Sequence, residues 1–203
     1  MRNKKNTALK IRKSSNKRYK MLIQQAWDNE SILRQFQNFE LSLMRCESLS
    51  ELIQTLLNEC RAIFDLDFVT LNLCDANSEI QQLLNPGKKE EKEVIQSISG
   101  LSFSLGEEKV MSFFDENQLP KLGQYDPTTH AELFQSCPIS IPIKSIALLL
   151  LKRDSHIIGC MSLGDIRLSR FKKDSATDFL QHLAAVISIC IDMTILRDKI
   201  KQH

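Results

Sequence analysis

The apolar residues between positions 48 and 64 recur at the spacing of one helix face. Ser48-Leu49-Ser50-Glu51 fits the capping box S-x-x-E, in which a serine and a glutamate three residues later satisfy the first free backbone N–H groups of a helix. The apolar positions that follow have i, i+3, i+4, i+7 spacing. They are Leu49, Leu52, Ile53, Leu56, Leu57, Cys60, Ile63 and Phe64. The pattern predicts an amphipathic helix that ends near Asp65.

The period changes from helical to alternating after this helix. In residues 68–74 one face carries Val69, Leu71 and Leu73, and the other carries Thr70, Asn72 and Cys74. Alternation of this kind predicts a strand with one apolar and one mixed face. Residues 80–84 are interpreted as a second strand, because the turn signal Asn-Pro-Gly follows them. Two short helices are predicted beyond it, over 88–98 and over 127–135, the latter with proline in its first turn.

Two apolar runs flank a polar tetrapeptide near the end of the chain. Residues 145–151 and 157–163 are almost wholly apolar, and Arg153-Asp154-Ser155-His156 separates them. Such runs predict a β-hairpin covered on both faces. Gly159 within the second run indicates close approach of another backbone or a bulge.

A long helix, capped by Asp174 or Ser175, is predicted over residues 175–200. Its expected buried stripe consists of Phe179, Leu183, Val186, Ile187, Cys190 and either Met193 or Thr194. Ile191, Ile195 and Leu196 extend the apolar surface around the helix. This surplus indicates a second partner besides the sheet.

The region before residue 48 divides into a basic tail and a long helix. Residues 1–20 hold nine of the 27 basic residues and no acid, so the formal charge of +2 hides a mildly acidic body. We expect residues 1–18 to be a disordered, solvated tail without aromatic residues for nucleic-acid stacking. Residues 19–47 show 3-4 spacing and are predicted to pair two copies of the chain, or alternatively to pack on their own domain. Residues 48–203 then form the folded domain.

The remaining composition excludes several function classes. No apolar run reaches the roughly 20 residues of a membrane span, and no apolar segment follows the basic N-terminus, so we expect a cytoplasmic protein without a span. The six cysteines form no CxxC pair and are expected to be free thiols. The four histidines lack metal-ligand spacing, and no nucleotide-binding or G-x-S-x-G motif occurs. The sequence therefore predicts no metal site and identifies no cofactor.

The order of helix, strand, irregular middle, apolar hairpin and terminal helix resembles a GAF domain. The matching pieces are residues 48–75 and 145–193. More closely, residues 20–200 resemble the GAF-like family called domain of unknown function 484. The motifs that carry this likeness are Leu122-Gly123, Leu133-Phe134, Ala147–Leu150, Leu163-Gly164-Asp165, Arg170-Phe171 and Thr177-Asp178-Phe179-Leu180. The last run is also similar to sensor regions that precede GGDEF domains of diguanylate cyclases, but this chain contains no GGDEF motif, so cyclic di-GMP synthesis is not carried over.

The resemblance implies an α+β fold, with a central antiparallel sheet, terminal helices on one face and a ligand pocket on the other. With no catalytic motif in the chain, we expect a non-enzymatic sensory or interaction domain of bacterial signalling, in which a small ligand or a partner biases helix packing and another protein reads the change. The long helices at both ends, over residues 19–47 and 175–200, predict that the chain forms a homodimer. By strand alternation, the pocket floor is predicted at Thr70, Asn72, Cys160 and Ser162, and the lid at Phe103, Tyr125, His130 and Phe134. Three alternatives stay open. The same residues fill a closed core; Cys137 or Cys160 serves a thiol enzyme resembling methionine sulfoxide reductase; or the basic tail contacts nucleic acid.

Overall fold

The computed structural model describes residues 33–84, 98–138, 141–154, 156–173 and 177–201. The chain divides into two compact units, Met1–Phe39 and Glu40–His203. In the first unit, the described residues 33–39 are helical, as predicted for the end of the long N-terminal helix; its predicted beginning lies outside the described residues. The second unit contains all of the described strands.

A five-stranded sheet forms the centre of this unit, in the order β2-β1-β5-β4-β3. Its strands are β1 (Phe68–Leu73), β2 (Leu101–Ser102), β3 (Lys121–Gln124), β4 (Ser145–Arg153) and β5 (His156–Asp165). β1 and β2 are parallel and the other neighbours are antiparallel. The predicted hairpin is confirmed as β4 and β5, and the predicted α+β class with a mainly antiparallel sheet is confirmed.

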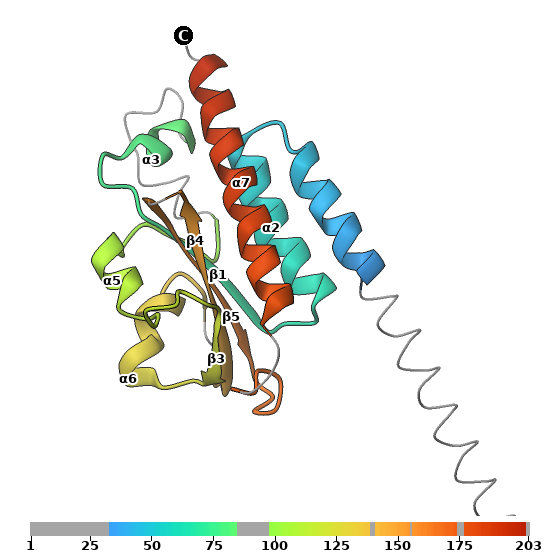
Figure 1. Cartoon of the computed structure of the whole chain (residues 1–203), viewed down its shortest axis with the longest axis vertical. Coiled ribbons are helices and arrows are strands. Elements are labelled where there is room, and N and C mark those ends of the chain that lie inside the picture. The colour runs from blue at the N-terminus through green and yellow to red at the C-terminus, as the bar shows by residue number, and fades with distance from the viewer. Residues whose placement is uncertain (1–32, 85–97, 139–140, 155, 174–176, 202–203) are drawn as a thin grey trace, which may run out of the picture. The chain divides into compact units, whose positions relative to one another are not determined.

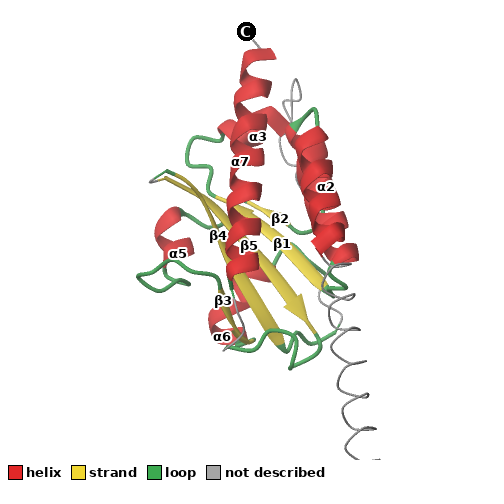
Figure 2. Cartoon of the chain, turned by 45° about the vertical axis from the view of Figure 1, so that its right-hand side comes forward, coloured by secondary structure: helices red, strands yellow, loops and turns green. Residues whose placement is uncertain are grey.

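Two long helices cover one face of the sheet. They are α2 (Leu49–Ile63) and α7 (Asp178–Lys201), and α7 packs mainly on β4 (Figures 1 and 2). The short helix α3 (Glu79–Leu84) contacts both of them. The opposite face carries α5 (Glu107–Met111), α6 (Pro127–His130) and the 3-10 turn η1 (Ala131–Phe134) (Figure 1).

The start of α2 follows the capping box closely. Ser48 has an extended backbone, and its hydroxyl accepts from the Glu51 N–H at 3.3 Å. The Glu51 carboxylate accepts from the N–H of Glu47, one residue before the cap, at 2.7 Å. Burial of the apolar face from Leu49 to Cys60 confirms the predicted helix.

Gly159 lies where β5 pairs with Leu73 of β1. A Cβ atom built there would lie 2.0 Å from the carbonyl oxygen of Asn72. No real side chain tolerates that distance, so the predicted close approach of a second backbone is confirmed.

One predicted strand is wrong. Residues 80–84 belong to helix α3, because the Asp75 carboxylate accepts from the N–H groups of Ile80 and Gln81 at 3.1 and 2.9 Å and so fixes the beginning of a helix. The predicted helix over 127–135 is confirmed as α6 and η1, with Asp126 as the N-cap. The predicted helix over 88–98 lies almost wholly outside the described residues, as do the proposed caps of the terminal helix.

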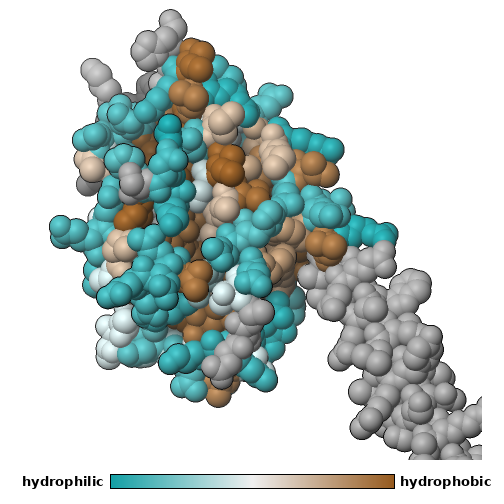
Figure 3. All heavy atoms as spheres, viewed as in Figure 1, coloured by the Kyte–Doolittle hydropathy of each residue, from teal (hydrophilic) through white to brown (hydrophobic). Residues whose placement is uncertain are grey.

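The predicted buried face of α7 needs correction. Leu183, Ile187, Cys190 and Thr194 are buried as expected, and Ile191 is buried too. Phe179, predicted inside, is exposed, and Val186 is only half-buried; of the two alternatives Met193 and Thr194, Thr194 is the buried one. Ala184 and Ser188 take their place against the sheet. The error has a physical cause: α7 is apolar on two sides, and brown patches lie in its region in Figure 3.

Among the described helices, α7 is long and apolar enough to cross a membrane by length and composition. Of its most apolar window, 39% is buried within the fold.

Candidate functional site

The sheet face away from α2 and α7 holds most of the predicted site residues. The side chains of Thr70 and Asn72 on β1 both reach the main chain of η1. The Thr70 hydroxyl donates to the Leu133 carbonyl oxygen at 2.7 Å, and Asn72 Nδ2 donates to the same oxygen at 3.0 Å. Both side chains are fully buried. One carbonyl therefore holds η1 against the floor of the site.

Cys160 and Ser162 on β5 lie directly beside these two residues. β-Sheet pairing sets Thr70 opposite Ser162 and Asn72 opposite Cys160. The Cys160 sulfur lies 3.8 Å from the Ser162 hydroxyl. Asn72 Oδ1 is buried and has no hydrogen-bond partner in the described part of the chain. The predicted floor is thus a polar cluster of four side chains with one unpaired acceptor.

The predicted lid residues separate into two groups. Tyr125 contacts the ring of Phe134 edge-on, with centroids 5.9 Å apart, and the ring of His130 at 6.0 Å. Phe134 is fully buried above Gly164, where a Cβ would lie 3.1 Å from its ring. Phe103 is half-buried in the segment after β2. The structure therefore brings Tyr125, His130 and Phe134 together and places Phe103 in a different segment.

The imidazole of His130 closes the first turn of α6. Its Nδ1 accepts from the Asp126 N–H at 3.0 Å, which requires that nitrogen to be unprotonated. Burial lowers the pKa of His130, although the neighbouring Asp126 acts in the opposite direction. A neutral imidazole that accepts from the backbone of its own turn has a structural task.

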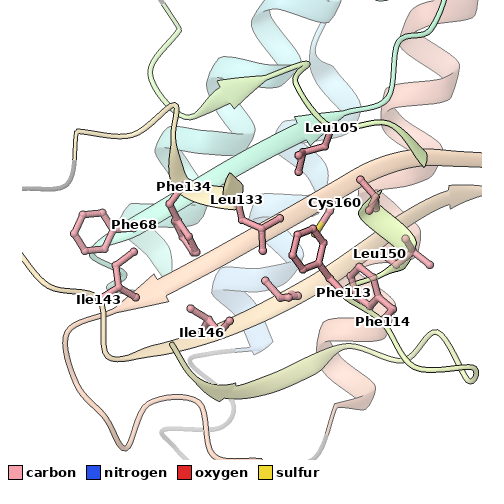
Figure 4. Close-up of a cluster of buried hydrophobic side chains, with 12 residues drawn as sticks. Phe68, Leu105, Phe113, Phe114, Leu133, Phe134, Ile143, Ile146, Leu150 and Cys160 are labelled. Carbon is pink, nitrogen blue, oxygen red and sulfur yellow. The ribbon is translucent and has the colours of Figure 1, made fainter. Parts of the chain in front are cut away.

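Apolar side chains fill the space between the sheet and the short elements above it (Figure 4). The cluster contains Phe68, Leu105, Val110, Phe113, Phe114, Leu133, Phe134, Ile143, Ile146, Leu148, Leu150 and Cys160. Leu133 and Phe134 lie in its middle and are fully buried. This face is therefore packed core around the polar floor. The assignment of the eight residues to a ligand pocket stays a prediction.

The thiols of this region are poor nucleophiles. Burial raises the pKa of Cys160 to about 12 and that of Cys74 to about 11. Burial also raises the pKa of Cys137, against the weaker opposing effect of Arg61. The thiolate is the reactive form, so all three groups are almost wholly protonated near neutral pH. Among the described residues, no group of three His, Cys, Asp or Glu side chains is placed to hold a metal ion.

Clefts formed by described residues lie elsewhere along α7, and the eight predicted site residues do not line the three considered below. One cleft of about 620 Å³ lies between the β1–α3 turn, the hairpin tip and α7. Its charged lining includes Asp75, Glu79, Arg153, Asp192 and Lys199. Two smaller clefts of about 330 and 350 Å³ lie between the hairpin end and the outer side of α7, near Ile189.

An ionic link at the end of β5 was not foreseen from the sequence. The fully buried carboxylate of Asp165 accepts from the backbone N–H and the guanidinium of Arg167 at 2.7–2.8 Å. Arg167 also donates to the carboxylate and the carbonyl oxygen of Asp65. The Asp165-x-Arg167 spacing was the available signal. The link joins the α2–β1 turn to the hairpin.

Comparison with known proteins gives a family and a fold. The model of the family described as protein of unknown function, DUF484, matches residues 5–194. The GAF domain of an Acinetobacter phosphoenolpyruvate-protein phosphotransferase is similar in structure. Its identity is 17% and its TM-score 0.52, with 79% of this chain and 92% of that one covered. The chromophore-binding domain of an unusual R. palustris bacteriophytochrome has 9% identity and a TM-score of 0.50. The match covers 86% of this chain and 63% of that one, less than two thirds of its length. No curated protein matches.

Proposed function

We propose that this chain, which belongs to the DUF484 family and has a GAF-like fold, is a non-enzymatic sensory or interaction module. In this proposal a small ligand occupies the η1 side of the sheet and changes the packing of the terminal helices. The module dimerises through residues 19–47 and 175–200, and a partner protein of bacterial signalling reads the change. The free cysteines support a reducing cytoplasm as its location.

The main support for the proposal is that the side chains of β4 pack on both faces of the sheet. Its residues Ile146, Leu148 and Leu150 belong to the apolar cluster under η1. The alternate residues of β4 point to the other face, where α7 packs. At the strand end, the Lys152 N–H donates to the Ser188 hydroxyl of α7 at 3.1 Å. A shift of β4 under a ligand would therefore move α7.

The polar floor indicates the chemistry of the ligand. If η1 moves away, Thr70 and Asn72 lose their shared acceptor, and two donors together with Asn72 Oδ1 face an apolar cavity. The matching ligand is small and largely apolar, with one carbonyl-like acceptor and one donor. Its acceptor would replace the Leu133 carbonyl, and its donor would satisfy Asn72 Oδ1.

The raised thiol pKa values support the absence of catalysis by Cys137 or Cys160. A catalytic cysteine requires a lowered pKa next to positive charge or at a helix N-terminus. The net effect of the surroundings raises the pKa of both thiols, which disfavours the sulfoxide reductase alternative.

The test is native mass spectrometry of the chain purified from its own host, before and after denaturation. We expect a small adduct on the native protein that denaturation releases. The Asn72→Leu variant should lack it, and the control Ser188→Ala, on the α7 side, should keep it. A bare native protein would overturn the ligand part of the proposal.

A second candidate function, an interaction scaffold with a closed core, is favoured by the filled cluster around Leu133 and Phe134. It predicts a bare protein that still dimerises. The same measurement separates the two functions, because it gives both the oligomer mass and the adduct mass.

A further inference from the structure

Helix α7 carries a row of exposed apolar side chains on its outer side. Ile189, Met193, Leu196 and Ile200 are 61%, 53%, 50% and 68% exposed. Figure 3 shows separate brown patches, with tan and teal spheres between them, in the region of α7. Large apolar side chains that are exposed in a continuous row mark a binding surface.

The spacing of this row is that of a coiled-coil seam. With the half-buried Val186, the intervals are three, four, three and four residues, so 186, 193 and 200 are a positions, and 189 and 196 are d positions. The core-facing residues Ile187, Ile191 and Thr194 lie on the opposite side of the helix. α7 therefore carries two apolar stripes, and only one of them is used by its own fold.

We propose that the seam of Val186, Ile189, Met193, Leu196 and Ile200 pairs with the same seam of a second copy, in parallel. The proposal rests on the dimer of the proposed function and assigns its α7 contact. The seam covers two heptads, or about 21 Å of helix. An isolated helix pair of that length is marginal. Here each helix is already held in shape by its packing on β4 and α2.

Charges beside the seam favour a copy of this chain as the occupant. In a parallel pair, a residue at position g faces the residue five positions later, at e, in the other helix. Asp192, whose carboxylate also pairs with Arg153 of its own chain at 2.6 Å, is at g, and Arg197 is at e. In the proposed pair, each Asp192 would therefore lie opposite Arg197 of the partner subunit. Within its own chain, Arg197 Nη1 donates to the Cys46 carbonyl oxygen at 2.7 Å.

The same charges disfavour a lipid surface as the occupant. Asp192, Arg197 and Lys199 lie within one or two residues of the seam over its whole C-terminal half. A helix that lies on a membrane keeps its charges on the face opposite the apolar one. The clefts beside Ile189 and Met193 are depressions next to the row of apolar side chains. Side chains of a second helix would pack into such depressions.

The first test measures the mass of the full chain in solution. We expect a wild-type dimer, and for Leu196→Glu a dimer dissociation constant raised at least about tenfold, because a glutamate from each copy would meet in the seam. The matched control is Leu168→Glu, since Leu168 is 55% exposed in the loop after β5. It should dimerise as the wild type does. Both variants should keep the wild-type fold by circular dichroism, since both sites face solvent within one chain.

The second test fixes the direction of the pair. Ile189→Cys and Ile200→Cys should each form a disulfide with their own copy under mild copper-phenanthroline oxidation, beyond the wild-type background. An antiparallel pair would cross-link only the mixture of the two variants and would overturn the parallel register. A dimer that resists Leu196→Glu and forms neither cross-link would overturn the seam but leave dimerisation through another surface. A wild-type monomer would overturn the seam and the dimer part of the proposed function together. An adduct, or its absence, bears only on ligand sensing.

Discussion

The two faces of the sheet are covered in different ways. On one face, the 15-residue α2, which begins with a capping box, and the 24-residue α7 bury apolar stripes along their lengths. On the other, the cover consists of the five-residue α5 and the four-residue elements α6 and η1. The first cover is continuous, and the second consists of short pieces.

The polar links on the two faces differ as well. On the η1 face, two neutral side chains share the Leu133 carbonyl. At the end of the hairpin, where the α2–β1 turn meets β5, the buried carboxylate of Asp165 binds Arg167. Short elements that are held by few bonds open at lower free-energy cost than long packed helices. The comparison therefore assigns adaptability to the η1 face and rigidity to the helix face.

The largest expected effect comes from the strand pair that both faces share. Gly159→Ala would place a Cβ atom against the Asn72 carbonyl oxygen, and β1 and β5 would have to separate. We expect a loss of about 4 kcal/mol or more in the free energy of unfolding, measured with urea. Gly123→Ala in β3 is the control, because nothing lies within 4 Å of its Cβ position, and its effect should stay below about 0.5 kcal/mol. Equal effects of the two changes would contradict the close approach.

A Leu→Ala substitution on each face compares how well the two covers are packed. Leu56 of α2 and Leu133 of η1 are both fully buried. Leu→Ala costs about 2 to 5 kcal/mol, and less where the surroundings collapse into the cavity. We expect Leu56→Ala to cost roughly 1 kcal/mol more than Leu133→Ala in urea unfolding, since a short turn relaxes more readily than a long helix. A larger loss for Leu133→Ala would reverse the comparison.

The helix face was also the more predictable from the sequence. The capping box and the 3-4 spacing of α2 are local signals, and the contacts confirm them. The apolar runs of β4 and β5 predicted the hairpin in the same way. For α7, periodicity predicts the helix but not its buried side. The helix has two apolar stripes, and tertiary packing decides which of them faces the sheet. Phe179 was therefore assigned to the wrong side, and the choice between Met193 and Thr194 stayed open.

The η1 face was predictable only in outline. The residues 80–84 were too few to distinguish a strand from a helix, and the deciding signal was the side chain of Asp75, five residues before Ile80. Alternation placed Thr70 and Asn72 on the mixed face of β1. Their acceptor, the Leu133 carbonyl, lies 63 and 61 residues away along the chain, and no local pattern announces such a contact.

The two polar links should respond differently to pH. Hydrogen bonds from Arg167 lower the pKa of Asp165 below that of an unfolded aspartate, despite its burial. A lowered folded-state pKa contributes stability that is present above the unfolded value of about 3.9 and is lost as the pH falls through the folded value. Asp165→Asn should thus cost about 2 kcal/mol at pH 7, and the difference from wild type should shrink below pH 4.

Urea unfolding at pH 7 and pH 3 measures this difference. Asp115→Asn is the control, because Asp115 is 81% exposed in its pair with Lys121, and it should change stability by less than about 0.5 kcal/mol at either pH. If Asp165→Asn lowers the free energy of unfolding equally at both pH values, the geometry of the link rather than the charge of Asp165 accounts for its contribution to stability.

The smallest change tests the neutral link. Thr70→Val keeps the size of the side chain but removes the hydroxyl that donates to the Leu133 carbonyl, while Asn72 Nδ2 remains bound to it. The loss of one such bond costs about 1 kcal/mol. If η1 opens apart from the rest of the fold, amide hydrogen exchange around residues 131–137 should accelerate about fivefold, the factor that 1 kcal/mol represents, with α2 unchanged. Acceleration spread equally over η1 and α2 would mean that the two faces open together, and the contrast between a rigid and an adaptable face would then fail.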